Sequence, residues 1–277
     1  MNSIETTDPK DLDWFNDPDP ERALSKYLKG HDNHYNRATA KCARSLIPAS
    51  LPANARVLDY GCGGGEMTVW LARQGWDVTA LDASSCSLGA CRLHLEREGL
   101  ADQVRTLHGQ PPDYWSALKS ETFDVIVAKD VIEHIDDDIG FLRELRSHLT
   151  PEGTAVVVTQ NDASWNYWAQ AREGFASDPA WCGWDETHVR FYNPPALAGK
   201  LIHAGLTPLK WRSAYLIPYR DWSWRGGLRG KLTRALAKMG GTGVFHWPER
   251  LFGGFAPLSR LGWSMAVVCR RDDSDRS

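Results

Sequence analysis

The chain has 277 residues, of which 42% are hydrophobic and 24% charged, and its formal net charge is −3. This length supports one large α/β domain, and the six scattered cysteines include no C-x-x-C pair, so they indicate neither a zinc ribbon nor a disulfide framework. The apolar runs are far shorter than the roughly 18 residues of a membrane span, and residues 1–21 are acidic, unlike a signal peptide. We therefore expect a cytoplasmic protein with a substantial core.

The chain divides into a lead-in, one domain and a tail. Residues 1–21 are rich in Asp and Pro, which predicts a disordered lead-in. A helical pattern covers residues 22–46 and is broken by two prolines before the first strand. The main domain is predicted to extend over residues 22–270, and residues 271–277 form a disordered tail.

Short β-branched runs alternate with helical patterns from residue 56 onward. Strands are predicted at 56–59, 77–81, 104–107, 123–128, 153–159, 206–211 and 262–269. Helices are predicted at 66–74, 84–98, 138–149 and 194–204. Such alternation is typical of a doubly wound α/β fold, in which helices cover both faces of a mostly parallel sheet.

Two segments interrupt this alternation. Residues 160–192 are rich in tryptophan and are predicted to form a substrate cap, in which the rings either line a pocket for an aromatic or isoprenoid acceptor or fill the core of the cap. Its tryptophans are Trp165, Trp168, Trp181 and Trp184. Residues 214–261 form a basic insertion, and the slightly wider stretch 211–262 holds nine basic residues and two acids. A basic amphipathic helix there would lie on an anionic membrane surface or pack on the sheet edge.

The most informative motif is the glycine loop, residues 61–65, within the sequence V-L-D-Y-G-C-G-G-G-E. It falls where a predicted strand ends and a helix begins, and glycines there let the backbone approach a ligand. Asp82 ends the next strand and is placed to accept hydrogen bonds from ribose hydroxyls, which NAD and S-adenosylmethionine share. Asp59 beside the loop suits a cationic amino-acid moiety and repels a pyrophosphate, so the charge favours the sulfonium cofactor.

These motifs resemble those of class I S-adenosylmethionine-dependent methyltransferases. The chain looks most like the ubiquinone-biosynthesis O-methyltransferases, through the glycine loop, Asp82, the Glu133-His134 pair and the later Thr187-His188 pair. The similarity covers about residues 31–210. It implies a Rossmann-like, seven-stranded sheet and S-adenosyl-L-methionine as the cofactor.

The resemblance also implies cofactor contacts for individual residues. Asp59, Gly61, Gly63 and Gly65 would shape the methionine pocket, and Asp82 would hold the ribose. The other implied contacts are Arg37 at the cofactor carboxylate, Gln110 at the adenine and Lys129 after the fourth strand. Gln110 stands where the relatives often have an acid, and the long cation of Lys129 is a departure from the family.

Catalysis is assigned to His134 with its neighbour Glu133. A hydroxyl acceptor must lose its proton, and a histidine at the carboxyl edge of the sheet is a candidate general base; the alternative is that His134 only orders the pocket floor. Asp130, Glu133, His134 and His188 could also bind a divalent metal such as Mg²⁺, although the metal-assisted relatives have Glu in place of Asp130.

The sequence thus predicts methyl transfer to an oxygen of a small-molecule acceptor, such as a lipid-linked phenol, a sugar or a secondary metabolite. One alternative is 2′-O-methylation of an RNA terminus, but a sequence pI of about 6.3 argues against nucleic acid as a partner. A second alternative is a non-catalytic cofactor-binding subunit. The basic insertion leaves peripheral contact with an anionic membrane open.

Overall fold

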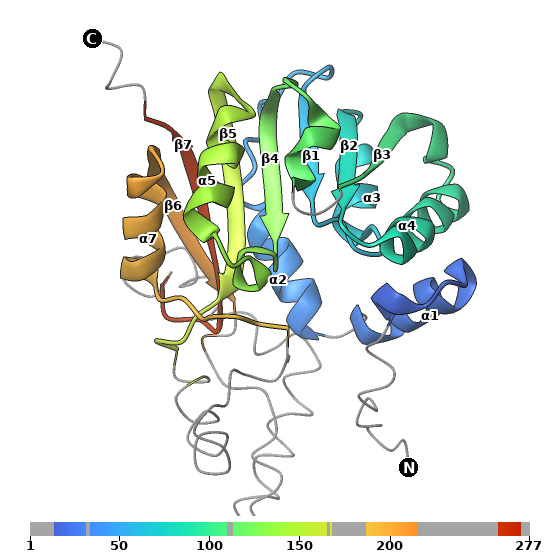
Figure 1. Cartoon of the computed structure of the whole chain (residues 1–277), viewed down its shortest axis with the longest axis horizontal. Helices are drawn as coiled ribbons and strands as arrows, with labels where there is room; N and C mark the ends of the chain where they lie inside the picture. Colours follow the sequence, from blue (N-terminus) through green and yellow to red (C-terminus); the bar gives the residue numbers. More distant parts are fainter. Residues whose placement is uncertain are drawn as a thin grey trace, which may run out of the picture.

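The computed structural model describes residues 14–31, 34–109, 113–164, 167, 187–214, 216 and 260–272. Seven strands in this part of the chain form a single sheet of order β3-β2-β1-β4-β5-β7-β6 (Figure 1). The strands are β1 (Arg56–Tyr60), β2 (Asp77–Asp82), β3 (Val104–His108), β4 (Phe123–Lys129), β5 (Leu149–Gln160), β6 (Leu206–Ala214) and β7 (Ser264–Arg271). The predicted doubly wound, seven-stranded sheet is confirmed.

Helices lie on both faces of the sheet and at one edge. The α-helices are α1 (Pro20–His31), α2 (His34–Arg44), α3 (Glu66–Ala72), α4 (Ser85–Arg97), α5 (Asp138–Ser147) and α7 (Pro194–His203). Short 3₁₀ helices lie between them, including η2 (Ala101–Gln103), η3 (Tyr114–Leu118) and η4 (Ile132–His134). Strands β1 to β5 run parallel, and β7 enters antiparallel between β5 and β6.

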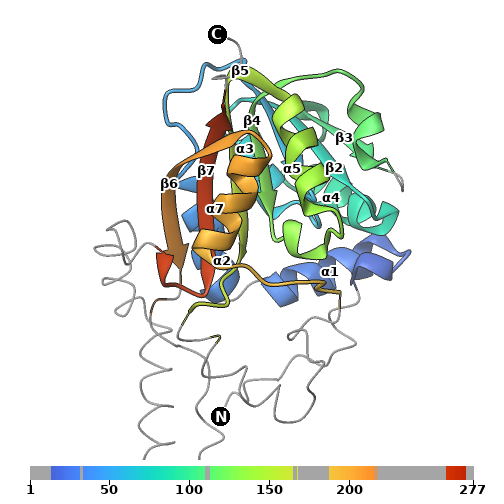
Figure 2. The same ribbon diagram turned by 60° about the vertical axis from the view of Figure 1, so that its left-hand side comes forward.

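Two separate cores explain why the strands are nearly continuous hydrophobic runs. Side chains that alternate along one strand, such as Val127 and Ile126, point to opposite faces and are fully buried in different clusters. Helices α2, α3 and α4 cover one face, while α5, α7 and η3 cover the other (Figure 2). The connections at the carboxyl ends of the parallel strands are therefore the positions available to a ligand.

The amino-terminal region differs from the prediction. The structure has two helices where one helical stretch was expected, and α1 begins at Pro20, within the predicted lead-in. Asp19 accepts hydrogen bonds from the first backbone amides of the helix, including that of Glu21 at 3.0 Å, and proline is favoured in the first helical turn. Trp14 packs on Tyr27 with ring centroids 4.9 Å apart, so residues 14–21 are ordered against α1. In Figure 1, α1 lies below α4 at the lower edge of the sheet.

Some predicted segments lie mostly outside the described residues. Of the cap, residues 165–166 and 168–186 are not described, and the same holds for residues 217–259 of the basic insertion. The four cap tryptophans and the predicted amphipathic helix belong to these stretches, so their roles stay predictions. Among the described residues, no helix is both long and apolar enough to cross a membrane.

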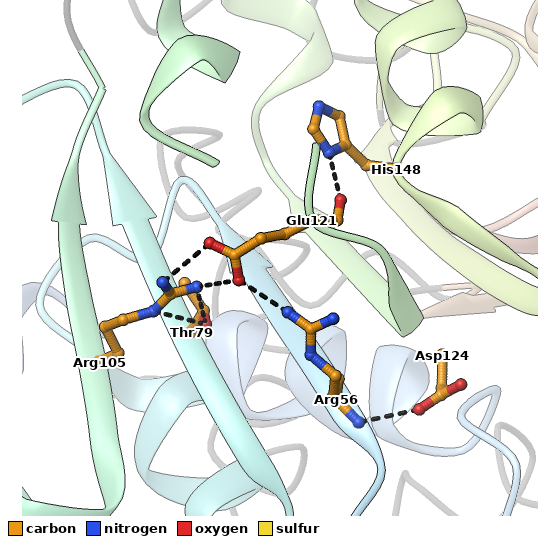
Figure 3. Close-up of polar contacts among 6 residues, drawn as sticks. All are labelled: Arg56, Thr79, Arg105, Glu121, Asp124 and His148. Carbon is orange, nitrogen blue, oxygen red and sulfur yellow. Dashed lines mark hydrogen bonds and ion pairs between the residues drawn. The ribbon is translucent and has the colours of Figure 1, made fainter. Parts of the chain in front are cut away.

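A polar network joins the amino ends of the strands, opposite the glycine loop. Glu121 precedes β4, and its Oε2 pairs with Arg56 at 2.7 Å and with Arg105 at 2.6 Å (Figure 3). The backbone amide of Arg56 donates to Asp124 at 2.9 Å, and His148 Nδ1 lies 2.6 Å from the carbonyl oxygen of Glu121. The Glu121 carboxylate thus pairs with two arginines at the edge of the sheet opposite the predicted site residues.

Candidate active site

The glycine loop connects β1 to α3 and lies against β2. The amides of Gly61 and Cys62 donate to the carbonyl of Leu81 at 2.8 and 3.1 Å, which fixes the loop beside the end of β2. Gly61, Gly63 and Gly65 all have positive φ angles, of 72°, 55° and 87°, a conformation that favours glycine. The geometry therefore explains the predicted glycines at these positions through backbone conformation.

Protein side chains, rather than open space, face the missing Cβ atoms of this loop. A Cβ at Gly64 would lie 2.3 Å from Cδ1 of Tyr27, and one at Gly61 would lie 2.4 Å from Cγ2 of Val131. The sequence predicted that the glycines let a ligand approach the backbone. In the structure Gly61 and Gly64 also leave space for the side chains of Val131 and Tyr27. Tyr27 in turn stacks on His31 at a centroid distance of 3.9 Å.

Asp82 joins the loop to the beginning of α4. Its Oδ2 accepts from the Gly63 amide at 2.8 Å, and its Oδ1 accepts from the Ser84 amide at 2.8 Å. Burial raises the pKa of this carboxyl, while these amide bonds favour its charged form. Ser84 caps α4 and also donates through Oγ to the carbonyl of Phe15 at 2.6 Å. The predicted ribose acid is thus held rigidly at the carboxyl end of β2.

Asp59 lies beneath the loop and is only 2% exposed. Its Oδ2 accepts a hydrogen bond of 2.6 Å from Thr68 Oγ1 on α3. Burial raises its pKa to about 6, against the lowering effects of the Thr68 bond and of the Lys129 charge. The Asp59 side chain therefore joins β1 to α3 through a hydrogen bond. Any electrostatic effect of its charge on a cationic ligand acts across the glycine loop.

We predict that Asp59 makes folding stability depend on pH. Because its pKa of about 6 in the folded protein exceeds the ordinary value of 3.8, the stability present below pH 3.8 is lost as the pH rises to about 6. The loss amounts to about 3 kcal/mol at most, at roughly 1.4 kcal/mol per pKa unit. Asp59→Asn should therefore raise the urea midpoint more at pH 7 than at pH 4; an equal change at both values would contradict this prediction.

Lys129 and Asp130 form an ion pair at the end of β4. The Lys129 Nζ lies 2.6 Å from Asp130 Oδ2, and Asp130 has a positive φ of 56°. Burial lowers the pKa of Lys129, but the Asp130 charge and hydrogen bond outweigh it and the net shift is upward. Burial, aided by the Lys129 charge, lowers the pKa of nearby His31 to about 4, so this imidazole is neutral.

The structure brings three of the four predicted metal ligands together. Ligand atoms of Glu133, His134 and His188 all lie within 4.8 Å of one another, whereas Asp130 stands outside this group and pairs with Lys129. The two imidazole rings meet edge to face with centroids 4.7 Å apart. We call Glu133, His134 and His188 the histidine cluster.

Glu133 is fully buried at the base of the histidine cluster. Its Oε2 accepts from Thr159 Oγ1 at 2.9 Å, while its Oε1 is buried without a hydrogen-bond partner among the described residues. Burial, reinforced by the charge of Asp130, raises its pKa to about 8. The Thr187 hydroxyl lies 2.9 Å from His134 Nδ1 and orients that ring. The histidine cluster thus contains a buried carboxyl oxygen that has no hydrogen-bond partner among the described residues.

Two other predicted residues remain untested. Arg37 lies on α2 with an exposed side chain, and Gln110 lies outside the described residues. Sequence reasoning overlooked Trp14, Tyr27 and His31, which lie against the glycine loop and Lys129. The helical pattern of 22–46 places Tyr27 and His31 one turn apart, and this spacing was the available signal.

The strand order and the acids at the carboxyl ends of β1 and β2 define the class I methyltransferase fold. Residues 33–210 match the family described as "Methyltransferase domain". The chain therefore belongs to the methyltransferase-domain family, and it is an S-adenosylmethionine-dependent enzyme.

Named relatives and solved structures agree with this membership. The chain is 28% identical over 235 residues to a ubiquinone biosynthesis O-methyltransferase of Cereibacter sphaeroides, covering 81% of this chain and 92% of the relative. It is 32% identical over 174 residues to the enzyme of that name from Ruegeria pomeroyi, covering 62% and 67%. The fold is similar to the 1,6-didemethyltoxoflavin-N1-methyltransferase of Burkholderia thailandensis, with a TM-score of 0.55, 20% identity, and coverage of 92% and 87%.

Proposed function

We propose that the chain transfers a methyl group to an oxygen of a small acceptor that carries an ionisable hydroxyl, most simply a phenol. The observation that carries this proposal is the meeting of Glu133, His134 and His188 at the carboxyl edge of the sheet, where the glycine loop also lies. Proton acceptors there suit a hydroxyl, which must lose a proton as it reacts. The relatives named O-methyltransferases support the same choice.

The residues of the chain divide the work between binding and proton removal. S-adenosylmethionine supplies a methyl group on a sulfonium, which leaves as a neutral thioether when the acceptor oxygen bonds to the methyl carbon. Asp82 would hold the ribose and the glycine loop would position the methionine part, so that the methyl faces the acceptor in line. His134, oriented by Thr187, would accept the hydroxyl proton.

The histidine cluster also fits a divalent cation. Its donor set of one carboxylate and two imidazoles is common for such ions, and the buried Oε1 of Glu133, which has no partner in the described part of the chain, is an oxygen that a cation would satisfy. We include Mg²⁺ or a similar ion in the proposal, with Glu133, His134 and His188 as ligands. When bound, such an ion lowers the pKa of a coordinated hydroxyl.

A transfer assay with methyl-labelled S-adenosylmethionine tests the proposal. We would offer 3,4-dihydroxybenzoate, a short prenylated phenol, glucose and a short RNA, with and without EDTA, and locate the methyl group by NMR. We expect label on a phenolic oxygen and a loss of turnover in EDTA that Mg²⁺ restores. Label only on nitrogen, carbon or RNA would contradict the acceptor, and EDTA-insensitive turnover would contradict the metal.

Binding of S-adenosylhomocysteine without transfer to any acceptor offered would show that the acceptor lies outside this set and would contradict the proposed phenol. Calorimetry with S-adenosylhomocysteine therefore accompanies the transfer assay. It distinguishes a protein that does not bind the cofactor from one that binds it but does not methylate the acceptors offered.

A further inference from the structure

The two histidines of the cluster come from segments far apart in the chain. His134 ends η4, while His188 lies in residues 187–192, which run alongside η4 and the turn after it. The Val189 amide donates to the Glu133 carbonyl at 2.9 Å, and Arg190 Nη2 donates to the Asp136 carbonyl at 2.6 Å. His188 therefore reaches His134 only while these two segments stay joined.

A buried carboxylate, that of Asp138, anchors the junction. It is the first residue of α5 and is only 4% exposed. Its Oδ2 accepts from the Tyr192 hydroxyl at 2.8 Å and pairs with Arg190 at 2.6 Å and with Lys200 at 2.7 Å. Burial raises the pKa of Asp138, but the bonds from Lys200, Arg190 and Tyr192 outweigh it and lower the pKa overall. The group is thus ionised and holds two residues of the 187–192 segment.

Helix capping does not account for this carboxylate. Asp137, the preceding residue, already caps α5, because its Oδ1 accepts from the Gly140 amide at 2.9 Å. Among the described residues, the side-chain bonds of Asp138 go to Arg190, Tyr192 and Lys200, that is, to the segment beyond His188 and to α7. Burying a carboxylate and two cations costs desolvation free energy, and their hydrogen bonds require a defined geometry. Such a group is suited to holding two segments in one arrangement.

We propose that Asp138 is a positioning residue, which through Arg190 and Tyr192 holds His188 against His134 in the geometry that methyl transfer requires. Asp138 acts through these two residues and is not itself assigned a contact with acceptor or cofactor. The inference rests on the proposed role of the histidine cluster, and it predicts that loss of the Asp138 charge affects turnover and ring geometry but not cofactor affinity.

The test uses Asp138→Asn, which keeps an acceptor for Tyr192 and removes the charge that pairs Arg190 and Lys200. Glu121→Gln is the matched control, since it also removes a carboxylate charge that pairs with two cations, here Arg56 and Arg105 at the opposite edge of the sheet (Figure 3). Both variants are compared at a temperature where each is fully folded, and S-adenosylhomocysteine should bind each within about twofold of wild type.

The first readout needs no acceptor. In the complex with S-adenosylhomocysteine, histidine-labelled protein should show a nuclear Overhauser effect between the rings of His134 and His188, whose centroids are 4.7 Å apart. We expect this signal to weaken severalfold in Asp138→Asn and to persist in Glu121→Gln. An unchanged signal in folded Asp138→Asn would overturn the proposal, whatever the outcome of the acceptor assay.

The second readout is kinetic. Misplacement of a reacting group costs on the order of 10- to 100-fold in rate, so we expect that loss in kcat for Asp138→Asn, with KM for S-adenosylmethionine nearly unchanged. The same substitution in a His188→Ala background should cost nothing further, and Arg190→Lys should retain more activity than Arg190→Met. Losses that add in the double variant would show a general structural role and overturn the assignment.

Discussion

Replacing Asp82 with Ala should lower the affinity for S-adenosylhomocysteine by about 100-fold or more. The carboxylate fixes the Gly63 and Ser84 amides, and it is the group we assign to the ribose hydroxyls. A hydrogen bond to a charged group contributes about 1.5 to 3 kcal/mol, so loss of two such bonds to the ribose removes about 3 to 6 kcal/mol. Calorimetric titration of the wild-type and variant proteins measures the difference directly.

Asp77→Ala is the matched control, because Asp77 is an exposed acid at the opposite end of the same strand, β2. This variant should bind S-adenosylhomocysteine as the wild type does. NAD is titrated beside it, since an acid in this position also suits a dinucleotide. Equal affinity of wild type and Asp82→Ala for S-adenosylhomocysteine would contradict the assigned ribose contact, and saturable binding of NAD would contradict the selectivity of the site for S-adenosylmethionine.

Local patterns were sufficient to predict strands β1 to β4, whereas β5 begins at Leu149, four residues before its predicted start. Each of the strands β1 to β4 ends within one residue of its predicted end, because a β-branched run and the glycine or acid after it are neighbours in sequence. Asp82 and the glycine loop could be placed together for the same reason, since parallel strands β1 and β2 end at one edge. To predict that residues at the ends of neighbouring parallel strands lie together, one needs only the order of the strands and helices along the chain.

Contacts between distant segments were less predictable. The approach of α1 to the glycine loop depends on Tyr27 packing against Gly64, and the helical spacing of Tyr27 and His31 indicates a shared face but not that the loop is its partner. The spacing of Asp130 predicted a metal ligand, whereas in the structure Asp130 pairs with Lys129 and lies outside the histidine cluster. The spacing along the chain did not reveal that the neighbouring lysine is its partner.

Replacing His188 with Ala should reduce methyl transfer about 10²- to 10⁴-fold, the usual contribution of a positioned acid or base, while S-adenosylhomocysteine still binds normally. His134→Ala should behave in the same way, because the rings are in contact and both belong to the group around the buried Glu133 oxygen. Turnover of the labelled cofactor with the accepted phenol measures the effect, and His203→Ala, an exposed position at the end of α7, is the control.

The pair of variants also separates the two proposed roles of the cluster. If the histidines bind a metal, excess Mg²⁺ should partly restore His188→Ala, since Glu133 and His134 remain as ligands. If His134 is the base and no metal takes part, His134→Ala should recover at high pH, where the acceptor ionises unaided, and Mg²⁺ should have no effect on either variant. Near-wild-type turnover in both variants would remove the base and the metal together, leaving orientation by the cofactor pocket as the source of catalysis.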